Sequence, residues 1–412
     1  MLNQKKILIV GGGISGITAA LELAETGHCV TLIEKKTYLG GNVAKFSYYF
    51  PKLCPPHCGL ELNFQRIRNN HNIRILTSTV LDTYKKTDKS FEVKLNSKHE
   101  FINNNCTSCG KCAEVCPVER SDDFNYGLTK TKAAFLPYPL VFPYKYSIDD
   151  SVCKQENCGL CLDVCPYNAI SFENKSTLLT EEFDSIILST GWQAYDAGKI
   201  ENLNYAFHPD IVTNVEFERL LSPEGPTNGQ IVKLSDKKVP ESIVFVQCAG
   251  SRDINHLPYC SAVCCSATLK HAIIASEKIK NVKITILYID LRVSGRNEDL
   301  LQKAKEINHI SFIKGKAGKV NIDLQNNLDI EYEDILKGKK CKIPADMVIL
   351  ATGIVPSTVS GFKTDNELFI DEELLPQGIF ATGSVKKPID VSASVKDAGR
   401  MALKSIQSMA NE

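Results

Sequence analysis

A glycine-rich stretch near the start of the chain constrains the fold more than any other feature. Gly11-Gly12-Gly13-Ile14-Ser15-Gly16 follows the apolar run 6–10 and precedes residues 15–26, which place Ala and Leu on one helical face. A second apolar run, 29–34, ends at Glu34. Strand, glycine turn, helix and a second strand with a terminal acid form the βαβ unit that binds a dinucleotide. The expected binding residues are Gly11, Gly13, Ser15, Gly16, Glu34 and Lys35.

Further glycine motifs favour FAD over NAD. Gly40-Gly41-Asn42 lies shortly after Glu34, Thr190-Gly191 ends another apolar run, and residues 378–383 have the sequence Gly-Ile-Phe-Ala-Thr-Gly. As a set they resemble the motifs of flavoproteins with two dinucleotide-binding domains. In that family the last motif ends in an Asp that holds the ribityl chain, and Ser384 stands at this position here. The resemblance adds the expected FAD residues Gly41, Asn42, Val80, Thr190, Gly191, Gly383 and Ser384.

A second βαβ pattern follows, with an expected strand at 242–246, helix at 261–278 and strand at 282–289. Residues 101–175 differ, because they are rich in Cys, Pro, Tyr and Asn and show little periodicity. The expected fold is α/β, with two doubly wound dinucleotide-binding-type domains, as in disulfide-reductase flavoproteins, and an inserted two-cluster ferredoxin module. The expected boundaries are 1–100, 176–240 and 346–412 for the FAD domain, 101–175 for the module and 241–345 for the second domain.

Sixteen cysteines in a chain without an export signal indicate metal or redox chemistry rather than disulfides. The run Cys106-x2-Cys109-x2-Cys112-x3-Cys116-Pro117 is repeated, with one wider gap, as Cys153-x4-Cys158-x2-Cys161-x3-Cys165-Pro166. Bacterial ferredoxins hold two [4Fe–4S] clusters in this way, and the fourth cysteine of each run ligates the other cluster. Zinc knuckles, which also use short Cys spacings, are the alternative. The expected sets are Cys106, Cys109, Cys112 and Cys165 for one cluster, and Cys153, Cys158, Cys161 and Cys116 for the other.

Four further cysteines mark the second βαβ unit. In NAD(P)H-linked flavoproteins with two such units, a second glycine-rich loop follows the strand and cradles the nicotinamide cofactor. Here the strand leads into Gln247-Cys248-Ala249-Gly250-Ser251-Arg252-Asp253. We therefore expect no hydride exchange with NAD(P)H, and electrons that reach FAD through clusters; buried structural thiols are the alternative. The expected ligands of a third [4Fe–4S] cluster are Cys248, Cys260, Cys264 and Cys265.

Cys54 and Cys58 flank Pro55-Pro56-His57, about twenty residues after Glu34, where disulfide-reductase flavoproteins place their redox-active pair. Such a pair beside a flavin serves as a dithiol or as metal ligands, and packed thiols are the third alternative. A catalytic role for Cys54 and Cys58 is the expectation that this position suggests.

Charge and hydropathy exclude several classes of function. The 412 residues carry 48 basic and 48 acidic side chains, so no overall positive field favours nucleic acid. No signal peptide is expected, and no run of about 18 uncharged apolar residues predicts a membrane span. We expect a cytoplasmic protein that meets the membrane only through partner subunits.

Three segments carry a more specific resemblance. Residues 50–56, 106–119 and 245–265 resemble the A subunit of heterodisulfide reductase and, more closely, the A subunit of the quinone-interacting membrane-bound oxidoreductase. The similarity extends over essentially the whole chain. The methanogen heterodisulfide reductase protein has a longer N-terminal domain and a C-terminal ferredoxin module, and the shortness of this chain favours the quinone-linked family.

The resemblance implies FAD, a third cluster at the Cys248 set, and a role in a membrane-bound complex. The implied partners are adenylylsulfate reductase, a second flavin/iron–sulfur subunit, and a haem-bearing membrane subunit, in dissimilatory sulfur metabolism. One alternative is a heterodisulfide reductase-type flavoprotein that bifurcates electrons. Others are an NAD(P)H-dependent iron–sulfur flavoprotein, similar to small subunits of glutamate synthase, and an electron-transfer scaffold with a purely structural flavin.

Overall fold

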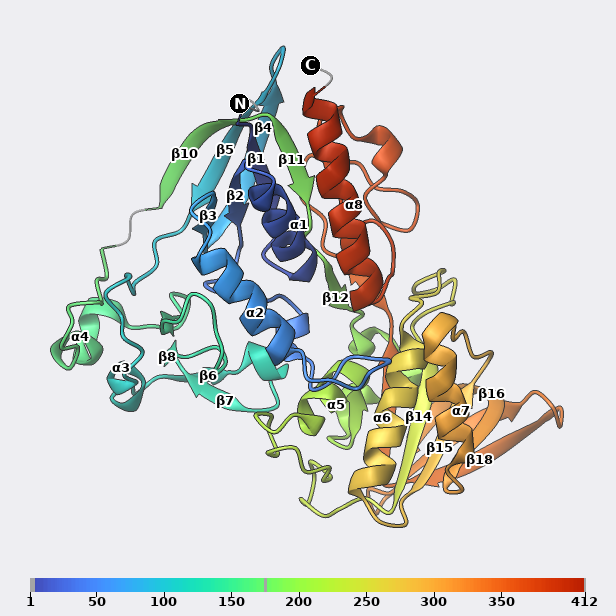
Figure 1. Cartoon of the computed structure of the whole chain (residues 1–412). Coiled ribbons are helices and arrows are strands. Elements are labelled where there is room, and N and C mark those ends of the chain that lie inside the picture. Colours follow the sequence, from blue (N-terminus) through green and yellow to red (C-terminus); the bar gives the residue numbers. More distant parts are fainter. Residues whose placement is uncertain (1–3, 174–175, 411–412) are drawn as a thin grey trace. The chain divides into compact units, whose positions relative to one another are not determined.

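The computed structural model describes residues 4–173 and 176–410. Packing divides the chain into two units. Figure 1 shows the whole chain, coloured by residue number. Unit 1 comprises Met1–Ala44, His57–Trp192 and Pro356–Glu412, and unit 2 comprises Lys45–Pro56 and Gln193–Val355. The chain passes from one unit to the other at four points: after Ala44, after Pro56, and within the short strands β12 (Trp192–Ala194) and β20 (Ile354–Pro356).

Unit 1 is built on a five-stranded parallel sheet in the order β21-β11-β1-β2-β3. Its central strands are buried on both faces, which explains their continuous apolar sequences. The helices α1 and α8 pack against each other, and they run side by side in Figure 1. The elements are β1 (Lys6–Val10), α1 (Ile14–Glu25), β2 (Cys29–Ile33), α2 (His57–Arg68), β3 (Ile73–Leu76), β11 (Ser185–Leu188), β21 (Ile379–Ala381) and α8 (Val391–Ala410).

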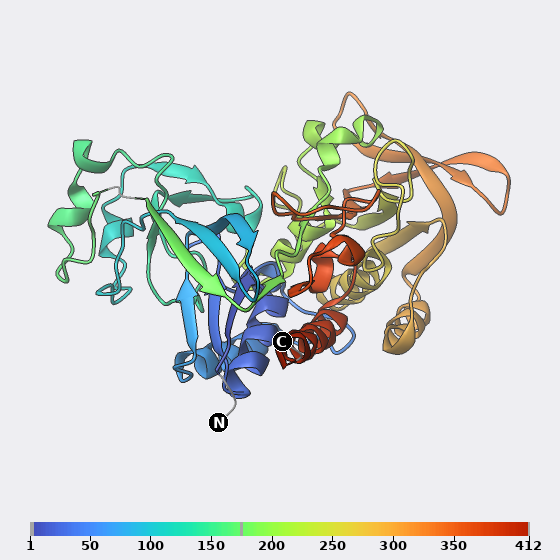
Figure 2. The ribbon, with the colours of Figure 1, turned by 90° about the horizontal axis from the view of Figure 1, so that it is seen from above.

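A second, antiparallel sheet of unit 1 has the order β10-β5-β4, with bounds β4 (Thr79–Lys86), β5 (Phe91–Ser97) and β10 (Thr177–Phe183). Figure 2 shows these strands side by side, β10 in green and the other two in blue. Alternate residues of β5, Phe91, Val93 and Leu95, are buried in one core with residues of the parallel sheet. This alternation is the pattern of a strand with one buried face.

The inserted module lies between β5 and β10 and has little regular structure. Its own small core consists of Phe101, Ile102, Ile170 and Phe172, with several of the cysteines packed against it. The backbones of Ile102 and Ile170 form a β-bridge that closes the module at its base. The elements are α3 (Lys111–Glu114), β6 (Glu119–Ser121), β7 (Lys130–Lys132), β8 (Ala134–Phe135), β9 (Ser147–Ile148) and α4 (Leu160–Asp163).

Unit 2 contains a seven-stranded sheet in the order β13-β19-β14-β15-β16-β17-β18. The strands from β13 to β16 in this order are parallel, and β17 and β18 continue as an antiparallel meander. The strands are β13 (Ile211–Thr213), β14 (Ser242–Ala249), β15 (Lys283–Tyr288), β16 (Ile310–Ile322), β17 (Leu328–Asp334), β18 (Lys339–Ala345) and β19 (Met347–Thr352). The helices are α5 (Asn214–Leu221), α6 (Cys264–Lys278) and α7 (Glu298–Glu306).

The turn from β14 to α6 differs from the expectation at both ends. The strand continues to Ala249 instead of ending at 246, and the helix begins at Cys264 instead of 261. Ser261 remains in the loop because its hydroxyl oxygen accepts the N–H of Ile354 at 2.9 Å and lies 3.0 Å from the Ser251 hydroxyl. Side-chain hydrogen bonds of this kind compete with helix formation.

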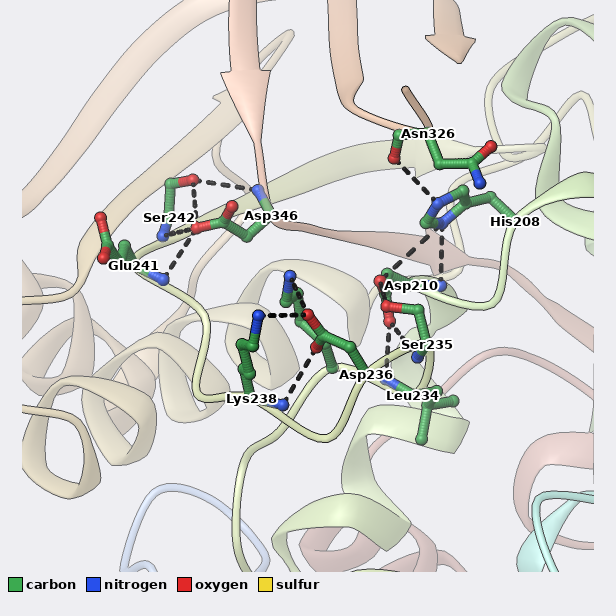
Figure 3. Close-up of polar contacts among 11 residues, drawn as sticks. His208, Asp210, Leu234, Ser235, Asp236, Lys238, Glu241, Ser242, Asn326 and Asp346 are labelled. Atoms are coloured by element: carbon green, nitrogen blue, oxygen red, sulfur yellow. Dashed lines mark hydrogen bonds and ion pairs between the residues drawn. The ribbon is translucent and has the colours of Figure 1, made fainter. Parts of the chain in front are cut away.

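Two aspartates fix the segment that leads into β14, as Figure 3 shows. The Asp210 carboxylate accepts the N–H groups of Leu234 and Ser235 at 2.6 and 3.1 Å. Asp346, just before β19, accepts the N–H groups of Glu241 and Ser242 at 2.8 and 2.9 Å. These bonds satisfy backbone donors at the start of β14 and so hold the strand that ends at Cys248 and Ala249.

The packing units differ from the expected domain boundaries in three places. Residues 45–56, 193–240 and 346–355, expected in the FAD domain, pack with unit 2. The boundaries otherwise stay a prediction. In the described ranges, no helix combines the length and the apolar character that crossing a membrane requires.

Candidate functional site

The glycine turn between β1 and α1 brings backbone segments unusually close together. Gly11 has a φ of +110°, and a Cβ on Gly16 would overlap the carbonyl oxygen of Gly11. The Ser189 hydroxyl donates to the carbonyls of Val10 and Gly11, each at 2.9 Å. Gly13, at the N-cap of α1, offers no side-chain acceptor, so first-turn N–H groups of the helix are available to a ligand anion.

Glu34 lies against this turn, at the end of β2. Its buried carboxylate accepts the N–H of Gly12 at 2.8 Å and the N–H of Lys36 at 2.9 Å. The Glu34 carbonyl accepts the N–H of Thr79 at 2.9 Å. Val80, one of the expected FAD residues, follows Thr79 in the chain and is exposed. The second glycine turn packs on the first, because a Cβ on Gly41 would lie 2.9 Å from the Cα of Gly13.

Gly383 belongs to the same cradle, because a Cβ there would overlap the hydroxyl of Ser15. Asp397 of α8 holds this turn by accepting the Thr382 hydroxyl and the Gly383 N–H, each at 2.9 Å. The Ser384 hydroxyl donates to the Ile389 carbonyl at 3.3 Å. Asp397 was not found from the sequence, because it lies 14 residues from Gly383 on another element.

The remaining expected FAD residues flank unit 1 strand ends. The Asn42 amide donates to the Trp192 carbonyl at 2.7 Å, and the Thr190 hydroxyl donates to the carbonyl of Ser357. Lys35 directly follows Glu34 in the chain, and Gly191 directly follows Thr190. The close glycine contacts and the first-turn N–H groups of α1 fit a bound dinucleotide.

The two cysteine repeats of the module have the same local geometry. Ser108 and Gln155, each two residues after the first cysteine of its run, have φ values of 57° and 48°. Their N–H groups donate to the sulfur atoms of Cys106 and Cys153, each at 3.4 Å. N–H groups aimed at sulfur stabilise thiolate ligands and tune cluster potentials.

The second cysteine set, which includes the exchanged fourth ligand, surrounds one cavity. This cavity is lined by Cys116 of the first run together with Cys153, Cys158 and Cys161 of the second. Burial and the nearby Cys153 raise the pKa of Cys161 to about 11. Four thiols around one cavity fit a [4Fe–4S] cluster, which keeps the thiolates ionised.

The first set lies on the same small core. Burial and the nearby Cys106 raise the pKa of Cys112 to about 12, with Cys161 and Cys109 adding to the effect. Cys165 packs against the module core, and its sulfur accepts the N–H of Ala169 at 3.4 Å. Within the described ranges, no three His, Cys, Asp or Glu side chains converge on a point that one metal ion could occupy. The thiolates of a four-iron cluster need not converge on one point, because they bind four separate iron atoms.

The third cysteine set lies in unit 2 and lines a cavity of its own. Cys248 has a φ of 57° near the end of β14, where a bulge interrupts the pairing with β19. Cys264 and Cys265 are the first residues of α6. Ala262 has a φ of 59° and donates its N–H to the Cys260 sulfur at 3.4 Å. The cavity is lined by Cys248, Cys260, Cys264 and Cys265 with Arg252, Asp290 and Arg292.

The Cys260 loop thus has the same geometry as the two module loops. In each loop, the residue two positions after the cysteine has a positive φ and donates its backbone N–H to the sulfur of that cysteine. The N–H of Arg292 donates to the Cys265 sulfur at 3.4 Å. Asp290 forms ion pairs with Arg252 and Arg292, so two guanidinium groups border the cavity. This donor set and its positive border fit an anionic thiolate-bound cluster.

Cys54 and Cys58 occupy different parts of the fold. Cys54 belongs to unit 2, where its carbonyl accepts the N–H of Tyr49 at 3.0 Å. Cys58 is exposed near the start of α2 in unit 1. The redox pair therefore stays a prediction.

A buried ionic cluster in unit 2 was missed in the sequence. The Glu218 carboxylate of α5 binds Lys270 and, at 2.5 Å, the Nε2 atom of His271, both on α6. It also accepts the N–H and hydroxyl of Ser47, each at 2.8 Å, which anchors the segment that leads to Cys54. Burial opposes the charge of Glu218, yet Lys270 and His271 hold its pKa below the ordinary value. Nothing in the local sequence connects α5 with α6.

Two parts of the chain match known family models. Residues 9–74 match an NAD(P)-binding Rossmann-like domain, and residues 99–119 and 156–171 match a 4Fe-4S binding domain. The first match covers the βαβ unit with its glycine turn, and the second covers parts of both cysteine runs. These matches support FAD and [4Fe–4S] clusters as cofactors.

Solved structures with the same fold include the thioredoxin reductases of Lactococcus lactis and T. acidophilum. Their TM-scores are 0.54 and 0.55, at 13% and 15% sequence identity. Each comparison covers 99% of this chain and 100% of the other. The expected α/β fold of the disulfide-reductase flavoprotein type is confirmed.

Sequence relatives extend over nearly the whole chain. The A subunit of the H(2):CoB-CoM heterodisulfide,ferredoxin reductase of Methanothermobacter thermautotrophicus is 31% identical over 97% of this chain and 63% of its own length. The iron-sulfur A subunit of the CoB–CoM heterodisulfide reductase of Methanocaldococcus jannaschii is 34% identical over 92% of this chain and 57% of its own. The chain thus spans about three fifths of these relatives. Its homologues are the A subunits of CoB–CoM heterodisulfide reductases, which are flavin and iron–sulfur oxidoreductases.

Proposed function

We propose that the chain is the FAD and iron–sulfur electron-transfer subunit of a multi-subunit oxidoreductase of the heterodisulfide reductase type. The observation that carries the proposal is the cysteine-lined cavity after β14. It occupies the position at which an NAD(P)H-dependent flavoprotein has its second phosphate loop. Electrons would therefore enter and leave through clusters rather than as hydride from a nicotinamide.

The proposed ligand sets are those expected from the sequence: Cys106, Cys109, Cys112 and Cys165; Cys116, Cys153, Cys158 and Cys161; Cys248, Cys260, Cys264 and Cys265. Bound FAD exchanges electrons in pairs or singly, whereas a cluster carries one at a time. Gly11, Gly13 and α1 would hold its pyrophosphate, and Glu34 would bind ribose hydroxyls. Backbone N–H groups at Cys106, Cys153 and Cys260 would stabilise the thiolates.

The nature of the partners separates two candidate complexes. The relatives carry the names of CoB–CoM heterodisulfide reductase subunits, which favours that type of complex over the quinone-linked one. The quinone-linked complex, with adenylylsulfate reductase and a haem-bearing membrane subunit, rests on the resemblance of residues 50–56, 106–119 and 245–265. It remains the second candidate, together with its location at the cytoplasmic face of the membrane.

Anaerobic titration with NADH and NADPH tests the central claim. With purified, FAD-loaded protein, stoichiometric nicotinamide should leave the flavin absorbance unchanged, whereas dithionite should bleach it. Rapid bleaching by either nicotinamide would contradict the proposal. If dithionite or a lower-potential reductant also failed to reduce the flavin, the flavin would be purely structural.

Anaerobic co-purification from the native source tests the complex. Heterodisulfide reductase-type partners should accompany the chain if the first candidate is correct. Adenylylsulfate reductase together with a haem-bearing membrane subunit would instead establish the second. A chain that purifies alone, with full electron-transfer activity towards small carriers, would contradict both.

A further inference from the structure

The inserted module meets the FAD cradle at a buried cluster of three aromatic rings. Tyr38 lies on the cradle side, two residues before Gly40, whereas Phe124 and Tyr138 belong to the module. The rings of Phe124 and Tyr138 stack with their centroids 5.1 Å apart, and Tyr38 meets Tyr138 edge-on at 5.6 Å. The three side chains are only 4–7% exposed. Parts of one chain move relative to one another by default unless their contact is extensive and apolar, so this contact indicates a fixed module.

Tyr138 also contacts the second glycine turn directly. Its hydroxyl donates to the carbonyl of Leu39 at 2.9 Å, and a Cβ on Gly40 would lie 3.0 Å from the same hydroxyl. The N–H of Gly40 in turn donates to the carbonyl of Gly12 at 2.8 Å. Burial raises the pKa of Tyr138, so its hydroxyl keeps the proton that it donates. Tyr138 thus binds the backbone that packs on the turn between β1 and α1.

A second group of contacts holds the module beside the three rings. The Glu100 carboxylate accepts the Ser78 hydroxyl at 2.9 Å and pairs with Lys145 of the module at 2.5 Å. The hydroxyls of Thr37 and Ser147 lie 2.6 Å apart. A cavity of about 310 Å³ is lined by members of this group and by two of the three rings. The module is therefore attached at more than one place, and a rotation about one contact would break the other.

We infer that Tyr138 is a positioning residue for electron transfer between the module clusters and FAD, and that the module passes electrons without moving. The inference rests on the proposed function, since it requires clusters in the module and FAD in the cradle. A reduced cluster loses one electron and FAD gains it; two such transfers, with two protons from water, reduce FAD fully. Because the rate of electron transfer falls steeply with distance, a residue that fixes the distance between the two groups also sets the rate.

Pulse radiolysis of the full chain tests the inference. The chain carries Cys264→Ala and is loaded with FAD and the module clusters, so that the third cluster offers no other route. Each pulse supplies less than one electron per chain, and the flavin absorbance follows its redistribution between FAD and the module. The rate should not change when sucrose raises the viscosity of the solvent, because no part of the chain has to move. A rate that falls as the viscosity rises would show a moving module and would overturn the inference.

Substitution of Tyr138 in the same background tests its role. Tyr138→Leu should slow the redistribution about 10- to 100-fold, since a displacement of about 1 Å between reacting groups can cost about 100-fold. The remaining rate should also become dependent on viscosity. Tyr138→Phe keeps the ring and should slow the transfer less. Tyr144→Leu is the matched control in the module, because the Tyr144 side chain is 53% exposed, and it should leave the rate unchanged. An unchanged rate in Tyr138→Leu would overturn the role of Tyr138.

Cofactor content separates positioning from folding. The Tyr138 variants should keep the flavin content, the iron content and the midpoint potentials of their background. Slow transfer together with lost FAD, lost iron or altered potentials would show that Tyr138 supports the sites themselves, and would overturn the positioning role. Bleaching of the flavin by NADH would contradict the proposed function without altering these rates, so the two failures are distinguishable.

Discussion

The βα turn after β1 in unit 1 and the βα turn after β14 in unit 2 occupy the same topological position and have different chemistry. In unit 1, the three residues Gly11, Gly12 and Gly13 connect β1 to α1, and no side chain of the N-cap residue caps the first-turn N–H groups of the helix. In unit 2, residues 250–263 connect β14 to α6, which begins with Cys264 and Cys265. The position at the end of the strand is retained, but thiols take the place of glycine and open N–H groups. One fold position thus suits an anion in one unit and metal ligation in the other.

The largest expected effect is the loss of FAD when a side chain is added to the glycine turn of unit 1. In Gly16→Ala, the added Cβ would overlap the backbone carbonyl of Gly11, which no side-chain movement can relieve. We expect purified protein with almost no FAD, measured as the flavin-to-protein ratio. Gly399→Ala in α8 is the control, because its Cβ would meet no atom within 4 Å. Full flavin content in Gly16→Ala would show that the turn does not hold FAD.

The corresponding change in unit 2 should remove iron and leave the flavin. Three four-iron clusters give about 12 iron atoms per chain, and Cys264→Ala should reduce the iron content to about 8. Cys341→Ala in β18, outside every proposed ligand set, should leave the iron content unchanged. If the unmodified chain contains about 8 iron atoms and Cys264→Ala contains the same number, the third cluster does not exist.

The helices that follow the two turns also differ in their buried faces. The buried residues of α1 are apolar or small, whereas α6 buries Lys270 and His271 against Glu218. Glu218→Gln removes the negative charge of this triad, and breaking a buried ion pair in this way costs about 3–5 kcal/mol of unfolding free energy. Chemical unfolding would measure the loss.

The matched control for Glu218→Gln is an exposed ion pair. Glu277 on α6 pairs with Lys303 at 2.9 Å, and both side chains are about half exposed. Glu277→Gln should change the unfolding free energy by about 0–1 kcal/mol. Equal effects of the two substitutions would show that the Glu218 triad does not stabilise unit 2.

The sequence was informative where the determinants are local. The first βαβ unit and the expected Cys116 exchange were predicted from spacing, because a glycine turn or a cysteine run carries its geometry in a few adjacent residues. Asp397 at the Gly383 turn and Glu218 beside α6 were not, because each contact joins residues on separate elements.

The start of α6 illustrates the same limit at a boundary. Helical periodicity extended the expected helix back to Ser261, but this hydroxyl is used by the N–H of Ile354, 93 residues away. The packing of 45–56 with unit 2 has a similar origin, because the Glu218 carboxylate binds Ser47 across 171 residues. Patterns in a short window contain no information about such partners.

The smallest expected effect is a pH dependence that arises from the α6 triad. Burial, together with Lys270, lowers the pKa of His271 below 6.5 despite the opposing effect of Glu218. The unfolded chain therefore takes up a proton at His271 before the folded chain does as the pH falls. The unfolding free energy should decrease below pH 6.5 by at most about 1.4 kcal/mol per pH unit from this group.

Comparing unfolding at pH 7.5 and 5.5 in the unmodified protein and in His271→Gln isolates the contribution of His271. The variant should lose part of the acid sensitivity, and an identical pH dependence in both proteins would show that His271 is not held neutral in the folded state.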